Sequence, residues 1–211
     1  MFVVAVVGGA LNAVAGGGSF LALPALLYAG VAPVAANATT ALALWPGSLS
    51  SAVAYRREII TTARWLLVLG SVSIVGGLLG ALLLLRTSDQ SFLRLLPWLM
   101  LISASTFTFG DSIHRVTGRV NLVAVVLLQL GISVYGGYFG AGMGLMMLAT
   151  MSIAGMTDIH EMNGLKSLLA VVINGVALVE FILHGAIAWR PGVIMIIGAT
   201  AGGYLGASVA R

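Results

Sequence analysis

The distribution of charge constrains this chain of 211 residues more than any other feature of its sequence. No Asp, Glu, Lys, Arg or His occurs between Met1 and Tyr55. Further uncharged stretches run over residues 65–85, 95–110, 120–157, 167–179 and 191–210. A helix needs about 20 apolar residues to cross the hydrocarbon core of a bilayer. Long uncharged stretches with charges gathered between them indicate membrane helices that are joined by short polar loops.

Composition excludes several other classes of protein. Hydrophobic residues make up 60% of the chain and charged residues only 8%, whereas a soluble domain carries about 25% charged residues. Cysteine is absent, which excludes disulfides, thiolate metal sites and a cysteine nucleophile. The net charge of +4 is spread without a basic cluster, so we expect no nucleic-acid partner. The predicted fold class is an all-α polytopic membrane protein, with a single transmembrane domain over residues 1–211 in a lipid bilayer.

The helical segments form two series that resemble each other. We expect helices near 2–15, 20–29, 34–55, 65–85 and 92–110, and then near 120–138, 144–155, 159–183 and 191–210. A shift of about 125 residues places Asn37 on Asn163 and Trp65 on Trp189. We therefore expect two homologous repeats, about 1–110 and 120–211, of which the second lacks a counterpart of helix 92–110. A seven-helix design and a chain without its final helix both fit this pattern.

Each predicted repeat opens with a helix that glycines interrupt, at residues 16–19 and 140–144. Backbone groups at membrane depth must face protein, water or a ligand. The short helix after each break presents free N–H groups and the positive end of a helix dipole, which suits an anion. Glycines without side chains let these amides approach a small oxyanion closely. The pairs Gly76/Gly80 and Gly202/Gly206 are instead expected to be helix-packing motifs.

Polar side chains in the helices after the breaks complete the predicted site. Polar residues inside a bilayer face the helix bundle or a wet cavity, and the two sets superpose under the repeat shift. We expect an anion to contact Gly17, Gly18, Ser19, Asn37, Thr40, Gly142, Gly144, Asn163 and Lys166, with Ser48, Ser167 and Asn174 as secondary candidates. No catalytic residue, metal ligand or cofactor is expected, and Met143, Met146 and Met147 are interpreted as core residues.

Lys166 is the only lysine of the chain and lies about two turns inside a predicted helix. An unpaired charge there costs at least about 2.5–3.5 kcal/mol on insertion scales. A bound anion, a carboxylate from Glu161 or Glu180, or extension of the side chain to the membrane interface would each lower that cost. Glu161 and His160 are also candidates for proton coupling, although their place at the helix start favours a capping or interface role.

Several runs of the sequence resemble a known family. The run 16–27 (GGGSFLALPALL), Gly30 and the run 36–40 (ANATT) look like the first repeat of the TauE/SafE sulfite exporter family, also described as the four-toluene-sulfonate uptake permeases. The runs 140–144, 163–166 and 202–206 resemble its later half. Members usually have eight helices, so the absent last segment is a departure. The resemblance implies a secondary transporter for sulfite, thiosulfate, sulfoacetate or other sulfonates in a bacterial inner membrane.

Other functions and the topology stay open at this stage. An anion channel would also need an anion site, and an intramembrane hydrolase would pair Ser19 or Ser167 with His184. Five arginines in the loops 56–64 and 111–119 predict that both loops are cytoplasmic. If the broken segments cross the membrane, the repeats are parallel and loop 184–190 is cytoplasmic; if they dive and return, the repeats are inverted and it lies outside. The sequence leaves open whether the chain forms a homo-oligomer.

Overall fold

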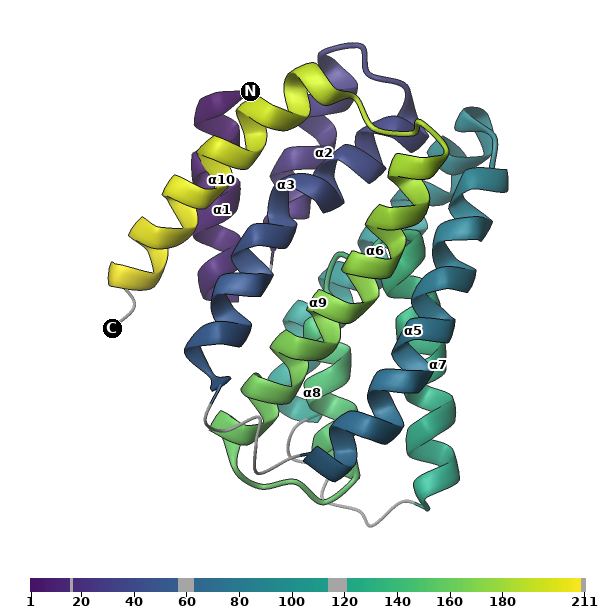
Figure 1. Cartoon of the computed structure of the whole chain (residues 1–211), viewed down its shortest axis with the longest axis vertical. Helices are drawn as coiled ribbons and strands as arrows, with labels where there is room; N and C mark the ends of the chain where they lie inside the picture. The colour runs from purple at the N-terminus through teal and green to yellow at the C-terminus, as the bar shows by residue number, and fades with distance from the viewer. Residues whose placement is uncertain (16, 57–62, 114–120, 210–211) are drawn as a thin grey trace.

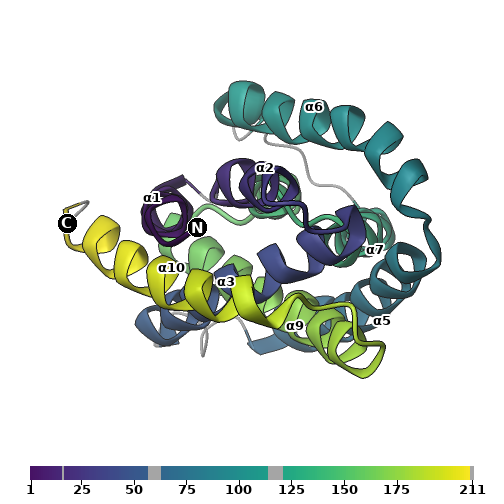
Figure 2. The same cartoon turned by 90° about the horizontal axis from the view of Figure 1, so that it is seen from above.

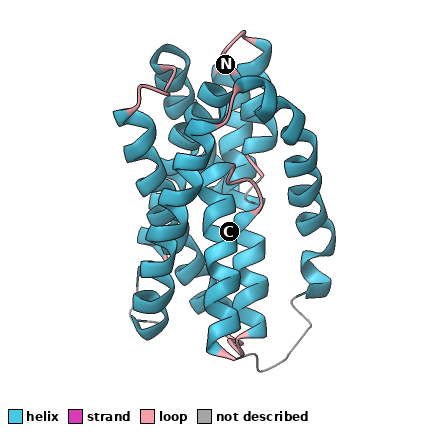
Figure 3. Cartoon of the chain, turned by 90° about the vertical axis from the view of Figure 1, so that its right-hand side faces the viewer, coloured by secondary structure: helices cyan, strands magenta, loops and turns pink. Residues whose placement is uncertain are grey.

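A computed structural model describes residues 1–15, 17–56, 63–113 and 121–209, and the regular structure of these residues is entirely helical (Figures 1 and 3). The first helices are α1 (Phe2–Ala15), α2 (Ser19–Tyr28), α3 (Pro33–Ala54), α5 (Ala63–Arg86) and α6 (Asp89–Ile113). They are followed by α7 (Leu122–Tyr138), α8 (Met143–Ile153), α9 (Ile159–Leu183) and α10 (Trp189–Val209). The expectation of an all-α protein is therefore confirmed for the described residues.

Helix boundaries follow local capping signals. The helix expected from residue 92 begins at Asp89, because the Ser88 hydroxyl accepts a hydrogen bond from the Ser91 amide at 3.2 Å and so caps the first turn. The helix α8 ends at Ile153, two residues before Gly155. Gly155 has a φ of 91°, a conformation that does not continue an α-helix. The helix expected over 159–183 has the same bounds in the structure.

The helices pack in neighbouring pairs that run along the long axis of the molecule. α1 lies along α10, α5 lies along α7, and α9 lies between α3 and α5 (Figure 1). In Figure 1, α1, α3 and α10 run from top to bottom, whereas α5, α7 and α9 run from bottom to top. α6 lies on the outside of the bundle, where it contacts α8 and α3 (Figure 2).

Glycines allow the two closest helix pairs to approach. A Cβ atom on Gly80 of α5 would overlap the Val134 carbonyl of α7, and one on Gly76 would overlap the Ser133 side chain. In the other pair, a Cβ atom on Gly202 of α10 would overlap the Val6 carbonyl of α1. Small residues at such seams let helix backbones pack closely in a membrane. The packing role is confirmed for these three glycines, whereas the surroundings of Gly206 are not among those that the structure describes.

The seam between α5 and α7 also contains a polar cluster. The side chains of Ser73, Gln129 and Ser133 are fully buried. The Gln129 amide nitrogen donates to the hydroxyl oxygens of Ser73 and Ser133, at 2.9 and 3.3 Å. The described contacts of the α1–α10 seam, in contrast, are made by backbone and by apolar residues such as Ala5, Gly9 and Ala199.

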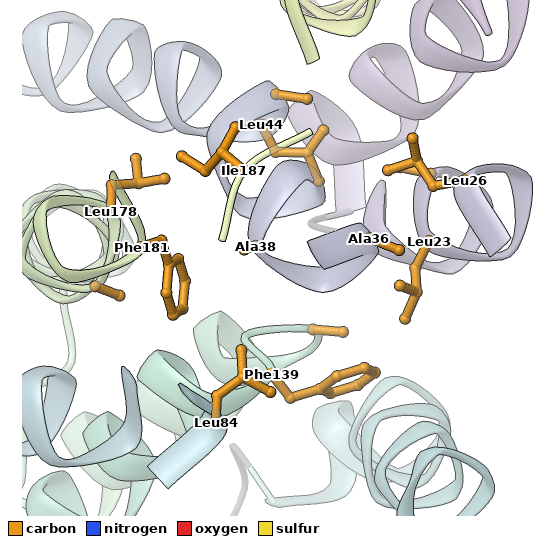
Figure 4. Close-up of a cluster of buried hydrophobic side chains, with 14 of the residues drawn as sticks. Leu23, Leu26, Ala36, Ala38, Leu44, Leu84, Phe139, Leu178, Phe181 and Ile187 are labelled. Carbon is orange, nitrogen blue, oxygen red and sulfur yellow. The ribbon is translucent and has the colours of Figure 1, made fainter. Parts of the chain in front are cut away.

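Two clusters of buried apolar side chains form the core. The first contains Leu23 and Leu26 of α2 on one side and Leu178 and Phe181 of α9 on the other, with Phe139 also part of it (Figure 4). The second contains residues from α5, α7, α8 and α9, including Met143 and Met147, with Met146 packed against it. The interpretation of these three methionines as core residues is confirmed. Tyr138 and Phe139 at the end of α7 belong to the first cluster and Met143 at the start of α8 belongs to the second, so residues of both clusters flank the interruption where the candidate site lies.

The outer surface of the bundle is apolar. Large side chains such as Leu67, Val123 and Leu127 are exposed, which is unfavourable in water but not against lipid tails. Two of the described helices, α5 and α9, are long and apolar enough to cross a membrane, with mean hydropathies of 2.3 and 2.0.

Candidate functional site

The interruption between α7 and α8 leaves backbone amides unpaired. Gly140 and Gly142 have φ values of 84° and 76°, a region that glycine adopts without steric cost. The amides of Phe139 and Gly140 both donate to the Tyr135 carbonyl, at 2.8 and 3.2 Å. Within the described part of the chain, the amides of Ala141, Gly142 and Gly144 have no hydrogen-bond acceptor. Three free donors therefore lie at the positive end of α8.

Neighbouring helices fix the orientation of this interruption through its carbonyl groups. Asn37 of α3 donates its side-chain amide to the Tyr138 carbonyl at 2.9 Å. The Tyr135 hydroxyl donates to the Ala141 carbonyl at 2.8 Å. Because C=O and N–H point in opposite directions across a trans peptide, the bond to Ala141 directs the Gly142 amide away from Tyr135.

Lys166 of α9 lies beside the start of α8. A Cβ atom on Gly144 would be 3.4 Å from Cδ of Lys166, so the aliphatic part of the lysine crosses the first turn of α8. The ammonium group donates to Oδ1 of Asn163 at 2.7 Å. Glu180 is not its partner, because 14 residues of helix separate them by about 21 Å. The Glu180 carboxylate instead lies 3.6 Å from Nδ1 of His184.

Two further polar residues of α9 lie on the same side of the helix bundle. Oδ1 of Asn174 would be 3.8 Å from a Cβ atom on Gly140, so Asn174 faces the interruption between α7 and α8. The hydroxyl groups of Ser167 and Ser51 are 3.0 Å apart and join α9 to α3, while Ser48 of α3 is partly buried. The structure thus brings the polar face of α9 against the start of α8.

The predicted residues of the first repeat have different neighbours. Gly18 precedes α2, and its carbonyl accepts from the amides of Leu21 and Ala22, while the Gly17 carbonyl accepts from Phe20. A Cβ atom on Gly18 would be 2.8 Å from the Asn12 side chain. Residue 16 lies outside the described residues. Gly17, Gly18 and Ser19 therefore lie at the start of α2, next to α1, and are separate from the Gly144–Lys166 contact.

Thr40, also predicted to contact the anion, bonds to its own helix in the structure. Its hydroxyl donates to the Ala36 carbonyl of its own helix at 2.9 Å, and its side chain is buried. A threonine that bonds to the carbonyl four residues earlier has used its only proton. Of the nine residues expected to contact the anion, the described contacts join Gly144, Asn163 and Lys166, with Gly142 two residues away.

The whole chain matches one family. The model described as Sulfite exporter TauE/SafE covers residues 1–211. The chain belongs to the TauE/SafE sulfite exporter family. This result confirms the resemblance seen in the glycine and asparagine motifs, and it makes the chain a transmembrane transporter of this family, with a lipid bilayer and a small-molecule substrate as partners.

Curated relatives agree with this assignment. A probable membrane transporter protein of Haemophilus influenzae is 29% identical over 99% of this chain and 83% of its own length. A probable membrane transporter protein of a Sinorhizobium species is 30% identical over 100% of this chain and 82% of its own. The probable membrane transporter protein YfcA of Escherichia coli K12 is 27% identical over 98% and 78%. No solved structure matches the TauE/SafE chain.

The start of α9 has a capping function in this TauE/SafE chain. Oδ1 of Asp158 accepts from the amides of His160 and Glu161, at 2.7 and 3.2 Å. His160 is exposed and Glu161 is partly buried. Asp158 therefore caps α9, and the two candidates for proton coupling, His160 and Glu161, lie in the first turn of the same helix as Lys166.

Three residues near the interruptions were missed by the sequence reasoning. Tyr135 holds the Ala141 carbonyl, Asn12 lies beside Gly18, and Ser103 of α6 lies beside Gly142. The hydroxyl-rich run 103–108 (SASTFT) within an uncharged stretch was the available signal for Ser103. Nothing in the local pattern indicated Tyr135, because its role depends on the backbone path six residues later.

Proposed function

We propose that this TauE/SafE protein is a secondary transporter that moves sulfite, thiosulfate, sulfoacetate or other organosulfonates across the bacterial inner membrane by alternating access. The observation that supports an anionic substrate is the start of α8, where the amides of Ala141, Gly142 and Gly144 have no acceptor among the described residues and Gly144 lies beside the stem of Lys166. Backbone amides and a helix dipole at such an end favour negative charge, and the family name indicates sulfur oxyanions.

Lys166 is the residue that gains most from a bound anion. Asn163 supplies a hydrogen bond to the ammonium group but no negative charge. An unpaired lysine inside a membrane helix costs at least about 2.5–3.5 kcal/mol, and an oxyanion at the start of α8 offsets this cost by Coulomb attraction. Transport rather than hydrolysis is proposed, since His184 lies at the end of α9 beside Glu180 and not near Ser167.

The repeat architecture is part of the same proposal. The first helix of the first proposed repeat, α1, pairs with α10, and the first helix of the second, α7, pairs with α5, which is the counterpart of α10. The equivalent helices α3 and α9 run in opposite directions (Figure 1), which favours inverted repeats, about 1–110 and 120–211. Transporters built this way hold substrate between the repeats and rock one against the other. The Asn37–Tyr138 bond crosses this boundary.

The test is a flux assay with the full chain reconstituted in vesicles. Sulfite, thiosulfate, sulfate, taurine and sulfoacetate are offered in turn, and the dependence of flux on concentration is measured. We expect saturable transport of a sulfur oxyanion and its loss in Lys166→Met. A non-saturating conductance would indicate a channel, and equal flux in Lys166→Met would remove the lysine from the site. Flux of none of these anions would contradict the proposed substrate class.

A further inference from the structure

We propose that a cavity between α6, α7 and α8 binds one acyl chain of a membrane phospholipid, with the head group of the lipid at the turn that follows α8. The cavity has a volume of about 280 Å³, whereas an apolar cavity of about 150 Å³ is large enough to bind benzene. One residue of α6, two of α7 and five of α8 line it. This site is separate from the proposed anion site and does not depend on it.

The walls of the cavity suit hydrocarbon better than water. Six of the eight described lining residues are apolar, and the other two are Thr106 and Thr150. The Thr106 hydroxyl donates to the Ser103 carbonyl at 2.6 Å, and the Thr150 hydroxyl donates to the Met146 carbonyl at 3.0 Å. Each threonine has thus used its only proton within its own helix. A buried water needs about two to four polar partners, which these walls do not supply.

The cavity extends along one face of α8. Its lining residues Leu145, Ala149 and Ile153 are four residues apart, so they share that face over about 12 Å of helix. Toward the start of α8, the helix α6 lies close to the backbone, because a Cβ atom on Gly142 would be 3.0 Å from the Thr106 hydroxyl oxygen. An elongated ligand therefore enters from the Ile153 end.

The Ile153 end of the cavity lies beside a polar turn. The helix α8 ends at Ile153, and Gly155, Thr157 and Asp158 in the turn that follows are exposed. Short polar turns between membrane helices lie at the membrane surface, where lipid head groups are located. A phospholipid with its head group at this turn can extend one tail along α8 into the cavity.

The cavity is continuous with the apolar surface of the bundle. Leu128 lines the cavity and is also exposed, and the neighbouring Leu127 is 61% exposed. Leu101 and Ile102 of α6 are exposed as well. Because lipid tails surround this surface in a transmembrane transporter, they are the apolar molecules that reach the cavity. An empty cavity would forfeit the dispersion contacts of its walls.

A bound tail would also complete the packing of α6. Phe92, Leu96 and Ser103 lie on one face of this helix and are buried, as their helical spacing predicts. Thr106 is the next residue on that face, but it is only partly buried and lines the cavity. An acyl chain therefore occupies the space that α6 leaves between itself and α8 at this level.

The experiment uses a phospholipid with a photoreactive diazirine in the middle of one acyl chain. The full chain is reconstituted in vesicles of phosphatidylethanolamine and phosphatidylglycerol that contain a trace of this lipid, and the residues labelled after irradiation are mapped by peptide mass spectrometry. We expect Met146 of α8, which lines the cavity and is only partly exposed, to be labelled as strongly as the exposed Leu127.

Three variants test whether the label reaches Met146 through the cavity. Ala149→Phe fills the cavity, and we expect it to abolish the labelling of Met146 while Leu127 stays labelled. Ala104→Phe adds the same side chain to an exposed residue of α6 and should leave the labelling unchanged. Thr150→Val should also leave it unchanged, since the hydroxyl proton is already used. Should Ala149→Phe not fold, Ala149→Leu replaces it, and a partial decrease is expected.

Several outcomes would overturn the inference. Labelling of Leu127 without labelling of Met146 in the original chain would show that no lipid tail enters the cavity. Equal labelling of Met146 in Ala149→Phe would show that lipid reaches this residue by another path. Loss of the Met146 label when the ratio of protein to lipid is raised would assign the cavity to a second copy of the chain. None of these results depends on whether an anion is transported, so the proposed function is tested separately.

Discussion

Asn37 illustrates how single side chains position the backbone of this protein. Its side-chain amide donates to the Tyr138 carbonyl of α7, in a region where no water is expected to replace it. Its bond holds the peptide where α7 ends, and direct contact with the anion stays a prediction. Asn37 therefore affects the free amides at the start of α8 indirectly. The path of the backbone from Tyr138 to Met143 determines the direction of their N–H groups.

Replacement of Asn37 by alanine should weaken anion binding by about 1–3 kcal/mol, since the Tyr138 carbonyl is left buried without a partner. The measurement is anion affinity and flux in vesicles. Ser50→Ala is the matched control on α3, because the Ser50 hydroxyl is exposed and donates to the Pro46 carbonyl of the same helix. Wild-type affinity in Asn37→Ala would show that the bond does not position the site.

At the scale of helices, the uncharged stretches and glycines predicted most of the fold. The helix over 159–183 has the predicted bounds, while the start of α6 was misplaced because the Ser88 cap was not recognised. Within the site, Lys166 and Gly144 were predictable because a lone charge and a glycine break are unusual in a membrane helix. The position of Ser103 beside Gly142 depends on how a distant helix packs, so the sequence did not predict it. The sequence also did not predict that the Thr40 hydroxyl bonds to a carbonyl of its own helix.

The seam between α5 and α7 gives a prediction about stability. A Cβ atom on Gly80 would overlap the Val134 carbonyl and would be 2.7 Å from the Tyr138 amide. We therefore expect Gly80→Ala to lower the free energy of unfolding by about 1–3 kcal/mol through overpacking, as measured by thermal melting in detergent. Gly70→Ala on the same helix meets only a Leu66 methyl at 3.8 Å, and alanine there should be neutral or stabilising. Equal melting temperatures for the two variants would contradict this account of the seam.

At the scale of the whole molecule, the opposite directions of α3 and α9 bear on topology. With inverted repeats, the end of α9 at His184 faces the periplasm if residues 56–64 and 111–119 are cytoplasmic. Residues 57–62 and 114–120 of these loops lie outside the described residues. The prediction concerns only the side of the membrane and does not depend on the identity of the substrate.

The chain contains no cysteine, so His184→Cys creates a single labelling site at an exposed helix end. We expect a membrane-impermeant maleimide to label this variant in intact cells whose outer membrane has been permeabilised. A cysteine in place of Arg56, which is also exposed, should react only after the inner membrane is opened. The reverse pattern would place both ends on the other side, and labelling of both from outside would contradict inverted repeats.

Proton coupling belongs to the same scale, because it links substrate movement to the membrane gradient. If His160 or Glu161 carries a proton during transport, a pH jump across the vesicle membrane should drive flux with equal substrate on both sides. The double variant His160→Gln, Glu161→Gln should lose this flux and keep exchange of substrate at equal pH. Absence of flux after the pH jump in the original chain would remove protons as the coupling ion.

The unlike seams of the bundle have a consequence for the transport cycle. Hydrogen bonds among Ser73, Gln129 and Ser133 cross the contact between α5 and α7, whereas backbone and apolar groups make the described contacts between α1 and α10. Sliding apart at the first seam breaks polar bonds in a medium that offers no substitutes, whereas the contacts described at the second seam are backbone and apolar packing. If the protein works by alternating access, as proposed, we expect its empty form to spend unequal times open to the two compartments.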